Sequence, residues 1–476
     1  MLQRLFPPLL LLILLCVPRV LAQGLPELGD VSAAAITPAD ERRLGESIML
    51  EIRRDPNYLD DAEVADYVNS LGGRLTARSD AVRQEFEFFV MRDSQINAFA
   101  LPGGFIGINS GLLLAAQSES EVAGVVGHEV AHVTQRHIAR MINQQGQSQL
   151  MSIAALAVAI LAARSNSQVA EAAMVFGQAG VMQSQLNFTR DNEREADRVG
   201  LQMLDAAGFD PRGMAGFFER LQRATRIYEG GAPSYLRTHP LTFERIADIQ
   251  NRIENLPYRQ VPDSLDFQLI RAKLRAETGT PRDAVAFFEA SFTERKFLSE
   301  TASRYGLVAS LIRARDFPRA QKEIVPLRKT SSPIIENLAC QLAVAAGDSA
   351  NALQCYQDAR RAYPASRALF YGHAEELLRA RQPAAVLQMI DSKTRTQSSD
   401  SRLYRLQAQA YAAQGNRLQQ HRAQGEAYFR SGQLGAAVEQ MQIALKTGEG
   451  DFYQLSAIEA RLRELRRMQL EQERKR

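Results

Sequence analysis

The chain has 476 residues, a length that predicts two or three domains, each large enough for its own core. Its composition is 45% hydrophobic and 23% charged, with 30 Gly and 18 Pro, so it is neither disordered nor collagen-like. Lys and Arg number 57 against 54 Asp and Glu, and the net charge of +3 gives no general electrostatic attraction to nucleic acid. We therefore expect no nucleic-acid partner.

The first 22 residues have the order of a secretory signal. A basic residue, Arg4, precedes an apolar run over residues 5–17, and the segment ends in the aliphatic and small residues Val20 and Ala22. A permanent membrane anchor is the alternative, but the run is shorter than the ~20 apolar residues that a span needs, and prolines interrupt it. We therefore expect cleavage after Ala22 and a soluble exported protein.

The sequence changes character near residues 255–267, where prolines and polar residues separate two helical patterns. Before this segment, strand-like runs at 87–90 and 98–108 lie among helices, which predicts an α+β domain over residues 23–257. After it, helices of about 12–16 residues alternate with tight turns and no strand signal, which predicts an all-α domain over residues 263–476.

The helices of the second half form a repeat. The predicted helices come in pairs, and an alanine recurs near the start of the second helix of each pair, at Ala284, Ala320, Ala352 and Ala385. The spacing is close to the ~34 residues of the tetratricopeptide repeat, and the pattern resembles that family, with its clearest copy at residues 333–366. The resemblance implies a solenoid of paired helices.

A helical array of this kind has no chemistry of its own, because each repeat only buries its apolar face against its neighbour. The array is either a spacer or a surface that binds proteins or peptides. Its regularity favours binding, since solenoids characteristically use their concave surface for that purpose.

Only Cys340 and Cys355 remain in the mature chain. Two cysteines cannot form a disulfide framework, so packing must hold the fold together. The two residues lie on opposite helices of one predicted repeat, which allows a disulfide without requiring one.

The most informative residues are His128, Glu129 and His132, in the pattern H-E-x-x-H. Histidines at i and i+4 lie one above the other on a helix, ~6 Å apart, so both imidazoles can reach one cation. Zinc suits neutral imidazole and lowers the pKa of a bound water, which Glu129 can deprotonate as general base.

We expect these residues on one helix over residues 119–140. Ser118 followed by Glu121 predicts a capping box at its start. Small residues along the helix, such as Gly124 and Gly127, permit close packing around a buried site.

A third zinc ligand is expected from a second helix downstream. Glu193 and Asp197 are again at i and i+4, so Glu193 can bind the metal while Asp197 reaches the second nitrogen of a ligand histidine and fixes its tautomer. Glu195 points ~160° away from Glu193 and is the less favoured ligand. Without the two histidines, these acids would be an ordinary charged helix face.

The H-E-x-x-H pattern and the downstream E-x-x-x-D pair resemble the M48 family of gluzincin metallopeptidases. The likeness extends over residues 36–254 and includes the runs at 97–108 and 134–140. It implies a zincin-like metallopeptidase fold for the first domain, mostly helical with a small sheet.

The resemblance also implies the roles of the site residues: one zinc ion on His128, His132 and Glu193, with Glu129 as base. Together with the leader and the repeats, it implies a periplasmic endopeptidase that acts on unfolded or misassembled outer-membrane β-barrel proteins and contacts the β-barrel assembly machinery. The alternative is a chaperone or scaffold that acts through the repeats, with little proteolysis.

The run at 97–108 has two interpretations in such a site. An exposed strand edge beside the zinc could pair with an extended substrate backbone. Gly103 and Gly104 also suit a turn, so an ordinary hairpin strand is the alternative. The resemblance favours substrate pairing.

Thr238, His239 and Pro240 are predicted to open a helix that includes Arg245, after a loop over residues 228–237. The M48 family carries a His-Pro-x-x-x-x-Arg element here, which implies that His239 lies near the metal. His239 could stabilise the oxyanion of the tetrahedral intermediate, or it could be a fourth ligand that displaces the catalytic water and keeps the enzyme latent. We hypothesise the second, because an unrestrained protease among unfolded exported proteins would be hazardous. A helix-start histidine without catalytic work is the third interpretation.

The remaining features carry weaker predictions. His137, His373 and His421 are predicted to be structural or solvated. The apolar residues 151–163 are too few for a membrane span, so they form a buried helix, a lid over the cleft or a contact with the membrane surface. The polar stretch at 143–149 favours a lid.

Overall fold

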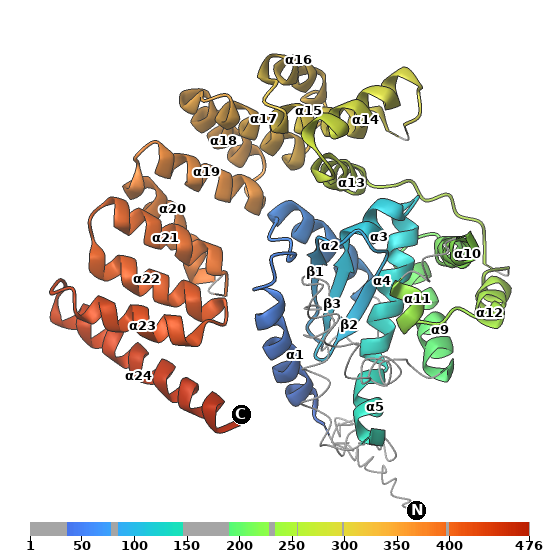
Figure 1. Cartoon of the computed structure of the whole chain (residues 1–476), viewed down its shortest axis with the longest axis horizontal. Coiled ribbons are helices and arrows are strands. Elements are labelled where there is room, and N and C mark those ends of the chain that lie inside the picture. Colours follow the sequence, from blue (N-terminus) through green and yellow to red (C-terminus); the bar gives the residue numbers. More distant parts are fainter. Residues whose placement is uncertain are drawn as a thin grey trace, which may run out of the picture.

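The computed structural model describes residues 36–77, 84–145, 190–227, 234–254, 256–297, 299–396 and 399–475. Figure 1 shows a mostly helical part with a small sheet and, beside it, a curved array of helices. This arrangement confirms the predicted fold class. The leader and the apolar segment at 151–163 lie outside the described residues, as does most of the loop expected before His239.

The sheet has three strands in the order β1-β3-β2. β1 (Glu87–Met91) runs parallel to β3 (Phe105–Asn109), and β2 (Ala98–Leu101) pairs antiparallel with the other side of β3. Among the described residues β2 pairs with no other strand, so it forms one edge of this sheet, and its side away from β3 is called the free edge of β2.

The run predicted at 98–108 is not one strand but a hairpin of β2 and β3, which confirms the alternative interpretation of its glycines as a turn. Gly103 and Gly104 make the turn in left-handed backbone, with φ of +77° and +91°. A Cβ on Gly104 would lie 2.2 Å from the carbonyl oxygen of Glu85, so only glycine fits there.

Side chains of β1 alternate between the two faces of the sheet. Phe88 packs in the core beneath α2 (Ala62–Thr76), whereas Phe89 packs on the opposite face beneath α1 (Pro38–Ile52). Thr37 caps α1 through a capping box, in which its hydroxyl accepts a hydrogen bond from the backbone N–H of Asp40, the third residue of the helix. The sheet is thus covered on both faces.

α4 (Glu119–Thr134) is the central helix of the α+β part and is buried along nearly its whole length. Ser118 caps it, as predicted, by accepting a hydrogen bond from the N–H of Glu121 at 3.3 Å. The Glu121 carboxylate does not close the predicted box, because it accepts from the N–H of Gln117 at 2.6 Å instead.

The helix predicted over 119–140 is two helices. α5 (His137–Gln145) begins after Arg136, whose φ of +54° lies in the left-handed region and ends α4. The Arg136 guanidinium holds this conformation by donating to the Glu41 carboxylate at 2.6 Å and to the Ile36 carbonyl at 2.7 Å. The break turns the first residue of α5 back toward the end of α4.

The other helices of the α+β part are α3 (Ser110–Ala115), α9 (Arg190–Ala206), α10 (Arg212–Ile227), α11 (Ser234–Thr238) and α12 (Phe243–Glu254). α9 and α10 pack against α4. The predicted helix start at Pro240 is wrong. His239 follows the last residue of α11 and donates its backbone N–H to the Tyr235 carbonyl at 2.9 Å. α12 begins later because the hydroxyl of Thr242 accepts from the N–H of Arg245 at 3.3 Å and caps it.

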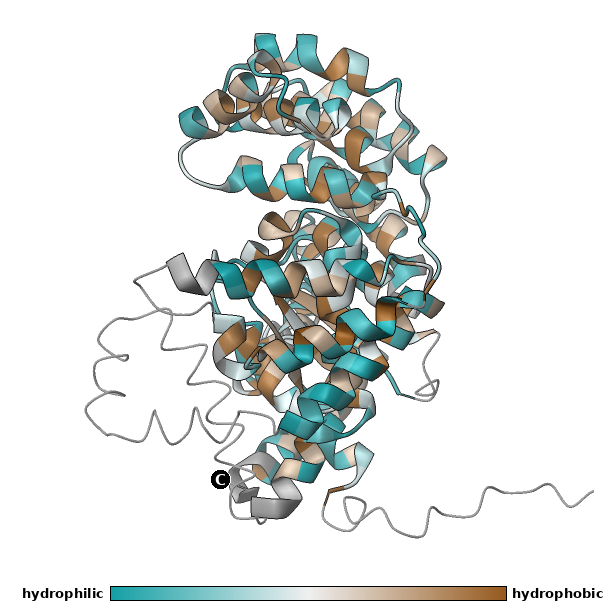
Figure 2. Cartoon of the chain, turned by 90° about the vertical axis from the view of Figure 1, so that its right-hand side faces the viewer, coloured by the Kyte–Doolittle hydropathy of each residue, from teal (hydrophilic) through white to brown (hydrophobic). Residues whose placement is uncertain are grey.

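The array is built of antiparallel helices. They are α13 (Leu265–Glu277), α14 (Pro281–Thr293), α15 (Glu300–Arg313), α16 (Phe317–Leu327), α17 (Pro333–Ala345), α18 (Ser349–Ala362), α19 (Arg367–Arg379), α20 (Pro383–Thr396), α21 (Ser401–Ala413), α22 (Arg417–Arg430), α23 (Leu434–Leu445) and α24 (Phe452–Lys475). Figure 2 shows apolar and polar residues interspersed along those helices of the array that lie at the top of the view. Such amphipathic helices bury one face against their neighbours.

A left-handed residue follows the first helix of each repeat. These residues are Gly279, Arg315, Gly347, Arg381 and Gly415. The predicted small residues follow a few positions later in the second helix: Ala284, Ala320 and Ala352 are buried, and Ala385 is partly buried. The repeat that the sequence predicts is therefore present in the structure.

Cys340 of α17 and Cys355 of α18 form a disulfide, which joins the two helices of one repeat. Among the residues that the structure describes, no helix is long and apolar enough to cross a membrane. The predicted spans of the two domains stay predictions, although α12 and α13 lie on either side of the expected boundary.

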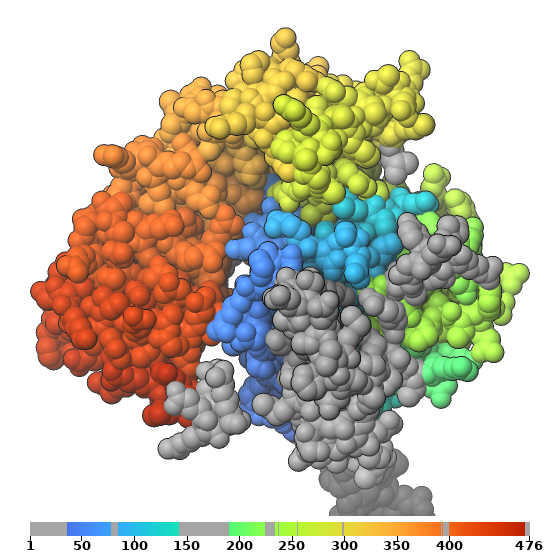
Figure 3. All heavy atoms as spheres, viewed as in Figure 1, coloured from blue at the N-terminus to red at the C-terminus, as the bar shows by residue number. Residues whose placement is uncertain are grey.

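The array folds back along α1 and α2. Lys273 of α13 donates to the carboxylate of Glu63 in α2 at 2.6 Å, and Arg54 after α1 donates to the carbonyl of Gly432 at 2.7 Å. Figure 3 shows the α1 and α2 segment in blue beside the array. In Figure 1, α9 to α12 lie on the opposite side of the sheet from α20 to α24.

Candidate active site

Glycines let the helices of the site approach one another closely. Gly127 of α4 lies opposite Gly200 of α9, and a Cβ on Gly200 would lie 2.9 Å from the backbone nitrogen of His128. Gly124 of α4 faces α10, where its Cβ would lie 2.9 Å from the Cβ of Met214. These small residues place α9 directly against the helix that carries the two histidines, as expected.

His128, His132, Glu193 and His239 meet in one buried cluster. One potential ligand atom of each lies within 4.8 Å of the others. Nε2 of His128 is 3.0 Å from Nε2 of His132, and Nδ1 of His239 is 3.0 Å from Oε1 of Glu193. The structure thus brings together the three predicted ligands and places His239 beside them.

Burial and neighbouring charges shift the pKa values of the groups in this cluster. Burial lowers the pKa of His128, but Asp197 and Glu193 outweigh burial and raise that pKa to about 9. Burial opposes ionisation of Glu193, yet His239, His128 and His132 hold its pKa well below the usual value. At His132 burial dominates and lowers the pKa well below its usual value, so this imidazole is neutral at physiological pH. A metal cation that replaced the proton of His128 would meet two imidazole nitrogens and a carboxylate, a donor set that suits zinc.

Asp197 contacts the ring nitrogen of His128 that faces away from the other cluster residues. Its Oδ1 lies 2.9 Å from Nδ1 of His128, the nitrogen that faces away from the cluster. Arg245 donates to both carboxylate oxygens of Asp197, at 2.7 Å and 2.8 Å, and its Nη1 lies 2.7 Å from Oε2 of Glu193. Burial raises the pKa of Asp197, but His128 and Arg245 outweigh it and lower that pKa.

Arg245 is a residue that sequence reasoning left without a role. An arginine in an amphipathic helix is ordinarily solvated. Here it is 3% exposed, because the two carboxylates of α9 require a buried counter-charge. The signal that could have found it is the His-Pro-x-x-x-x-Arg element itself.

His137, predicted to be structural or solvated, supports His132. Its Nδ1 lies 2.8 Å from Nδ1 of His132, and its Nε2 lies 3.0 Å from Oε2 of Glu195. Arg140 donates to the same oxygen of Glu195 at 2.8 Å. Burial lowers the pKa of His137 to about 4, so its ring is neutral and can accept a hydrogen bond from His132 Nδ1–H while donating one to Glu195. Glu195 itself lies outside the cluster, as expected.

Glu129 is fully buried beside the cluster. Both of its carboxylate oxygens lack a hydrogen-bond partner among the described residues, and Oε1 lies 3.5 Å from Nε2 of His239. Burial raises the pKa of Glu129, while His239, His128 and the backbone amide of Ala100 in β2 oppose that rise. A carboxylate with unused acceptors and a raised pKa is suited to take up a proton.

Tyr235 of α11 covers the cluster, and sequence reasoning did not single it out. Its ring stacks on that of His239 with centroids 4.8 Å apart, and its hydroxyl is buried without a hydrogen-bond partner among the described residues. It holds His239 against the cluster by packing.

The comparisons with known proteins agree with this site. The chain matches peptidase family M48 over residues 62–253. It is 30% identical over 453 residues to the beta-barrel assembly-enhancing protease of Escherichia coli (strain K12), an alignment that covers 94% of this chain and 92% of the relative.

Two further relatives cover different shares of the chain. The beta-barrel assembly-enhancing protease of Yersinia pestis is 29% identical over 447 residues, covering 93% of this chain and 92% of the relative. The mitochondrial metalloendopeptidase OMA1 of Schizosaccharomyces pombe is 33% identical over 198 residues, covering 41% of this chain and 54% of the relative. The chain therefore belongs to the metallopeptidases of family M48, in the group of the beta-barrel assembly-enhancing proteases.

Proposed function

We propose that the chain is a zinc-dependent endopeptidase in which His128, His132 and Glu193 hold one zinc ion. The observation that carries this proposal is the buried cluster of imidazole and carboxylate groups beside the unpartnered Glu129. Bound zinc supplies a Lewis acid and lowers the pKa of a bound water to about 7.

The residues of this chain would divide the work between them. Glu129 accepts the proton of the attacking water on a carboxylate oxygen and returns it to the leaving amine. Asp197 holds Nδ1 of His128, which directs Nε2 of that ring into the cluster. The burial of the whole set excludes bulk water and strengthens these interactions.

The free edge of β2 is the proposed binding place for the substrate backbone. β2 lies at the edge of the sheet, and Ala100 within it is close enough to Glu129 to affect its pKa. An extended peptide that pairs with this edge would present a peptide bond next to the base, with little selection of side chains.

We propose that His239 is a fourth ligand that keeps the site latent. Its Nδ1 lies 3.4 Å from Nε2 of His128 and 3.0 Å from Oε1 of Glu193, which places it among the proposed ligands. We expect His239→Ala to cleave an unfolded substrate faster than the unsubstituted chain, with zinc still bound. A loss of cleavage would instead support the role of His239 as an oxyanion donor.

The setting of the reaction is proposed from the relatives. Their name states a part in β-barrel assembly. We propose that this chain works in the periplasm on unfolded or misassembled outer-membrane β-barrel proteins, in contact with the β-barrel assembly machinery. The secretory pattern of residues 1–22 supports export.

The proposal is tested with Glu129→Gln in the full chain. We expect this variant to keep about one zinc per chain by elemental analysis and to lose cleavage of an unfolded β-barrel substrate by a factor of about 10³ or more. Glu244→Gln, at an exposed position of α12, is the matched control and should cleave normally. Cleavage by Glu129→Gln at the normal rate, or an unsubstituted chain that binds no zinc, would contradict the proposal.

A further inference from the structure

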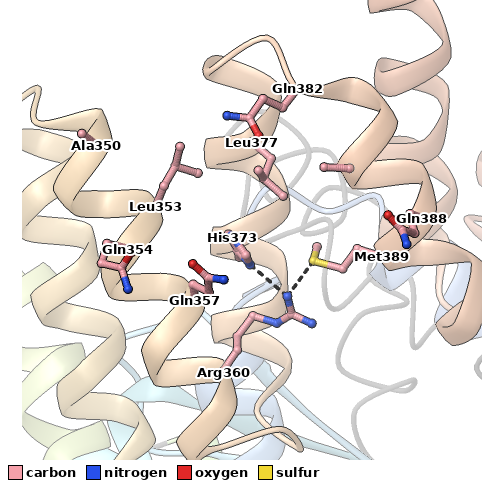
Figure 4. A pocket seen from close by; sticks show the side chains of 11 residues that line it. Ala350, Leu353, Gln354, Gln357, Arg360, His373, Leu377, Gln382, Gln388 and Met389 are labelled. Carbon is pink, nitrogen blue, oxygen red and sulfur yellow. Dashed lines mark hydrogen bonds between the residues drawn. The ribbon is translucent and has the colours of Figure 1, made fainter.

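A pocket in the helical array lies away from the proposed active site. α18, α19 and α20 form it, and its volume is about 470 Å³. Figure 4 shows side chains of α18 and α20 on its two sides, with His373 and Leu377 of α19 between them. Among the described residues, the lining contains one permanently charged side chain, that of Arg360, and no aspartate or glutamate.

Arg360 offers unused hydrogen-bond donors to this pocket. Its Nη1 lies 2.9 Å from Nδ1 of His373 and 2.8 Å from the sulfur of Met389, and Figure 4 shows both contacts. A guanidinium has five N–H donors in a planar fork. The donors on Nε and Nη2 of Arg360 have no protein acceptor within the described part of the chain.

The charges around Arg360 are not balanced by an acid. Burial lowers the pKa of Arg360, and no nearby carboxylate opposes that shift. Burial also lowers the pKa of His373 to about 4, so its ring is neutral and accepts from Arg360. Arg360 is therefore a partly buried cation with no carboxylate beside it among the described residues.

Other arginines of the array that are equally placed do have acidic partners. Arg367 of α19 donates to Asp66 at 2.7 Å, and Arg402 of α21 donates to Glu375 at 2.7 Å. All three arginines are partly buried, and only Arg360 among them faces a pocket without a carboxylate. Partial burial of an unpaired guanidinium costs free energy that an anionic ligand would offset.

We propose that this pocket binds the carboxylate of an extended peptide segment, with Nε and Nη2 of Arg360 as a two-pronged anchor. Guanidinium and carboxylate match in this geometry. The rim adds amide groups that can donate to and accept from a peptide backbone, on Gln357, Gln382 and Gln388. Leu353 and Leu377 add apolar contact for a neighbouring side chain. The carboxylate comes either from the C-terminus of the peptide or from an internal Asp or Glu.

The choice of a peptide as ligand rests on the proposed action on polypeptides, but the binding does not need the hydrolytic site. The experiment therefore uses the full chain carrying Glu129→Gln, and it measures binding by calorimetry. The probes are three acetylated peptides of alternating Thr and Leu: one with a free C-terminus, one amidated, and one amidated with an internal Glu.

We expect the amidated peptide without Glu to bind at least about tenfold more weakly than one of the two carboxylate peptides, because a charge-assisted hydrogen bond is lost. The tighter of those two identifies the source of the carboxylate. Arg360→Gln should remove the preference, whereas Arg361→Gln, at an exposed neighbouring position paired with Asp358, should keep it. Thermal unfolding of both variants shows whether they are folded.

The proposal is overturned if all three peptides bind equally to the chain with Arg360 intact, or if none binds. It is also overturned if folded Arg360→Gln keeps the preference for a carboxylate. Because the peptide comparison uses the unsubstituted pocket, it gives a result even if Arg360→Gln does not fold. Cleavage by the chain with Glu129 intact is measured separately, so failure of this pocket and failure of the endopeptidase proposal are distinguishable.

Discussion

The two histidines of α4 are supported in different ways. His128 contacts Asp197, which Arg245 holds in turn, and both of these residues are at most 3% exposed. His132 contacts His137, whose other nitrogen contacts Glu195, and the side chain of Glu195 is 30% exposed. The first support is short and buried, and the second is longer and ends at the surface.

This difference predicts which substitutions around the two histidines the fold tolerates. A buried ion pair that loses one partner leaves an uncompensated charge in a low dielectric, which is costly. A partly exposed pair such as Glu195 and Arg140 is screened by solvent and contributes little to stability. We therefore expect the support of His128 to be needed for folding, and the support of His132 to tune the metal site.

The largest effect is expected from Asp197→Ala. It leaves Arg245 buried with one of its two carboxylate partners missing, so the free energy of unfolding should fall by about 3–5 kcal/mol. Urea unfolding in the presence of a chelator measures this without a contribution from zinc. A loss no larger than that of Glu195→Ala would remove the proposed distinction between the two supports.

Next in size is the effect of His137→Ala on the metal. Loss of a group that orients a ligand typically weakens metal binding by about 10–100-fold. We expect a weakening in this range for zinc, measured by competition with a chromophoric chelator. His137→Gln keeps an acceptor and a donor and should recover part of the affinity. Unchanged affinity in His137→Ala would show that His132 does not depend on this support.

As the pH falls, we expect the stabilising contribution of His137 to be lost first and that of Asp197 at lower pH. The pKa of His137 is about 4 in the folded chain and about 6.5 in an unfolded one. As the pH falls through this window, the unfolded state takes up a proton that the folded state does not, so stability falls. The pKa of Asp197 is lowered by folding, so its contribution is lost only below about 3.9.

The measurement for this prediction is the free energy of unfolding of the metal-free chain as a function of pH. His137→Gln should make the decline between pH about 6.5 and about 4 shallower. A decline of the same steepness in that variant would assign it to other groups.

The smallest effect is expected from Glu195→Gln. The amide oxygen can still accept from His137, and the pair with Arg140 is partly exposed, so stability should change by less than about 1 kcal/mol. Asp197→Asn is the matched substitution on the buried side and should cost more. Equal costs for the two would contradict the account.

The parts of the site that depend on helix periodicity could be predicted from the sequence. His128 with His132, and Glu193 with Asp197, are each four residues apart, and this spacing alone places each pair on one helix face. The repeat array could also be predicted, because its small residues Ala284, Ala320, Ala352 and Ala385 recur at steps close to ~34 residues.

The rest depends on breaks in regular structure. In a continuous helix His137 would point ~140° away from His132. The left-handed backbone of Arg136 ends α4 and returns His137 to its neighbour, and nothing in the local sequence marks that position as glycine or asparagine would. The residues next to Arg245 do not predict its burial either, because the carboxylates that require it lie on α9, which is distant in sequence. Only the His-Pro-x-x-x-x-Arg element marks this arginine.

The central claim is that His128, His132 and Glu193 hold one zinc ion. Crystals of the Glu129→Gln chain grown with zinc, measured on both sides of the zinc absorption edge, test it most directly. The account predicts one anomalous peak about 2.0–2.2 Å from Nε2 of both histidines and from a carboxylate oxygen of Glu193. His239 is the proposed fourth ligand, so contact of the same peak with its ring is compatible with the claim. A chain that shows no peak in the cluster, or a peak that lacks His128, His132 or Glu193 among its ligands, would contradict it.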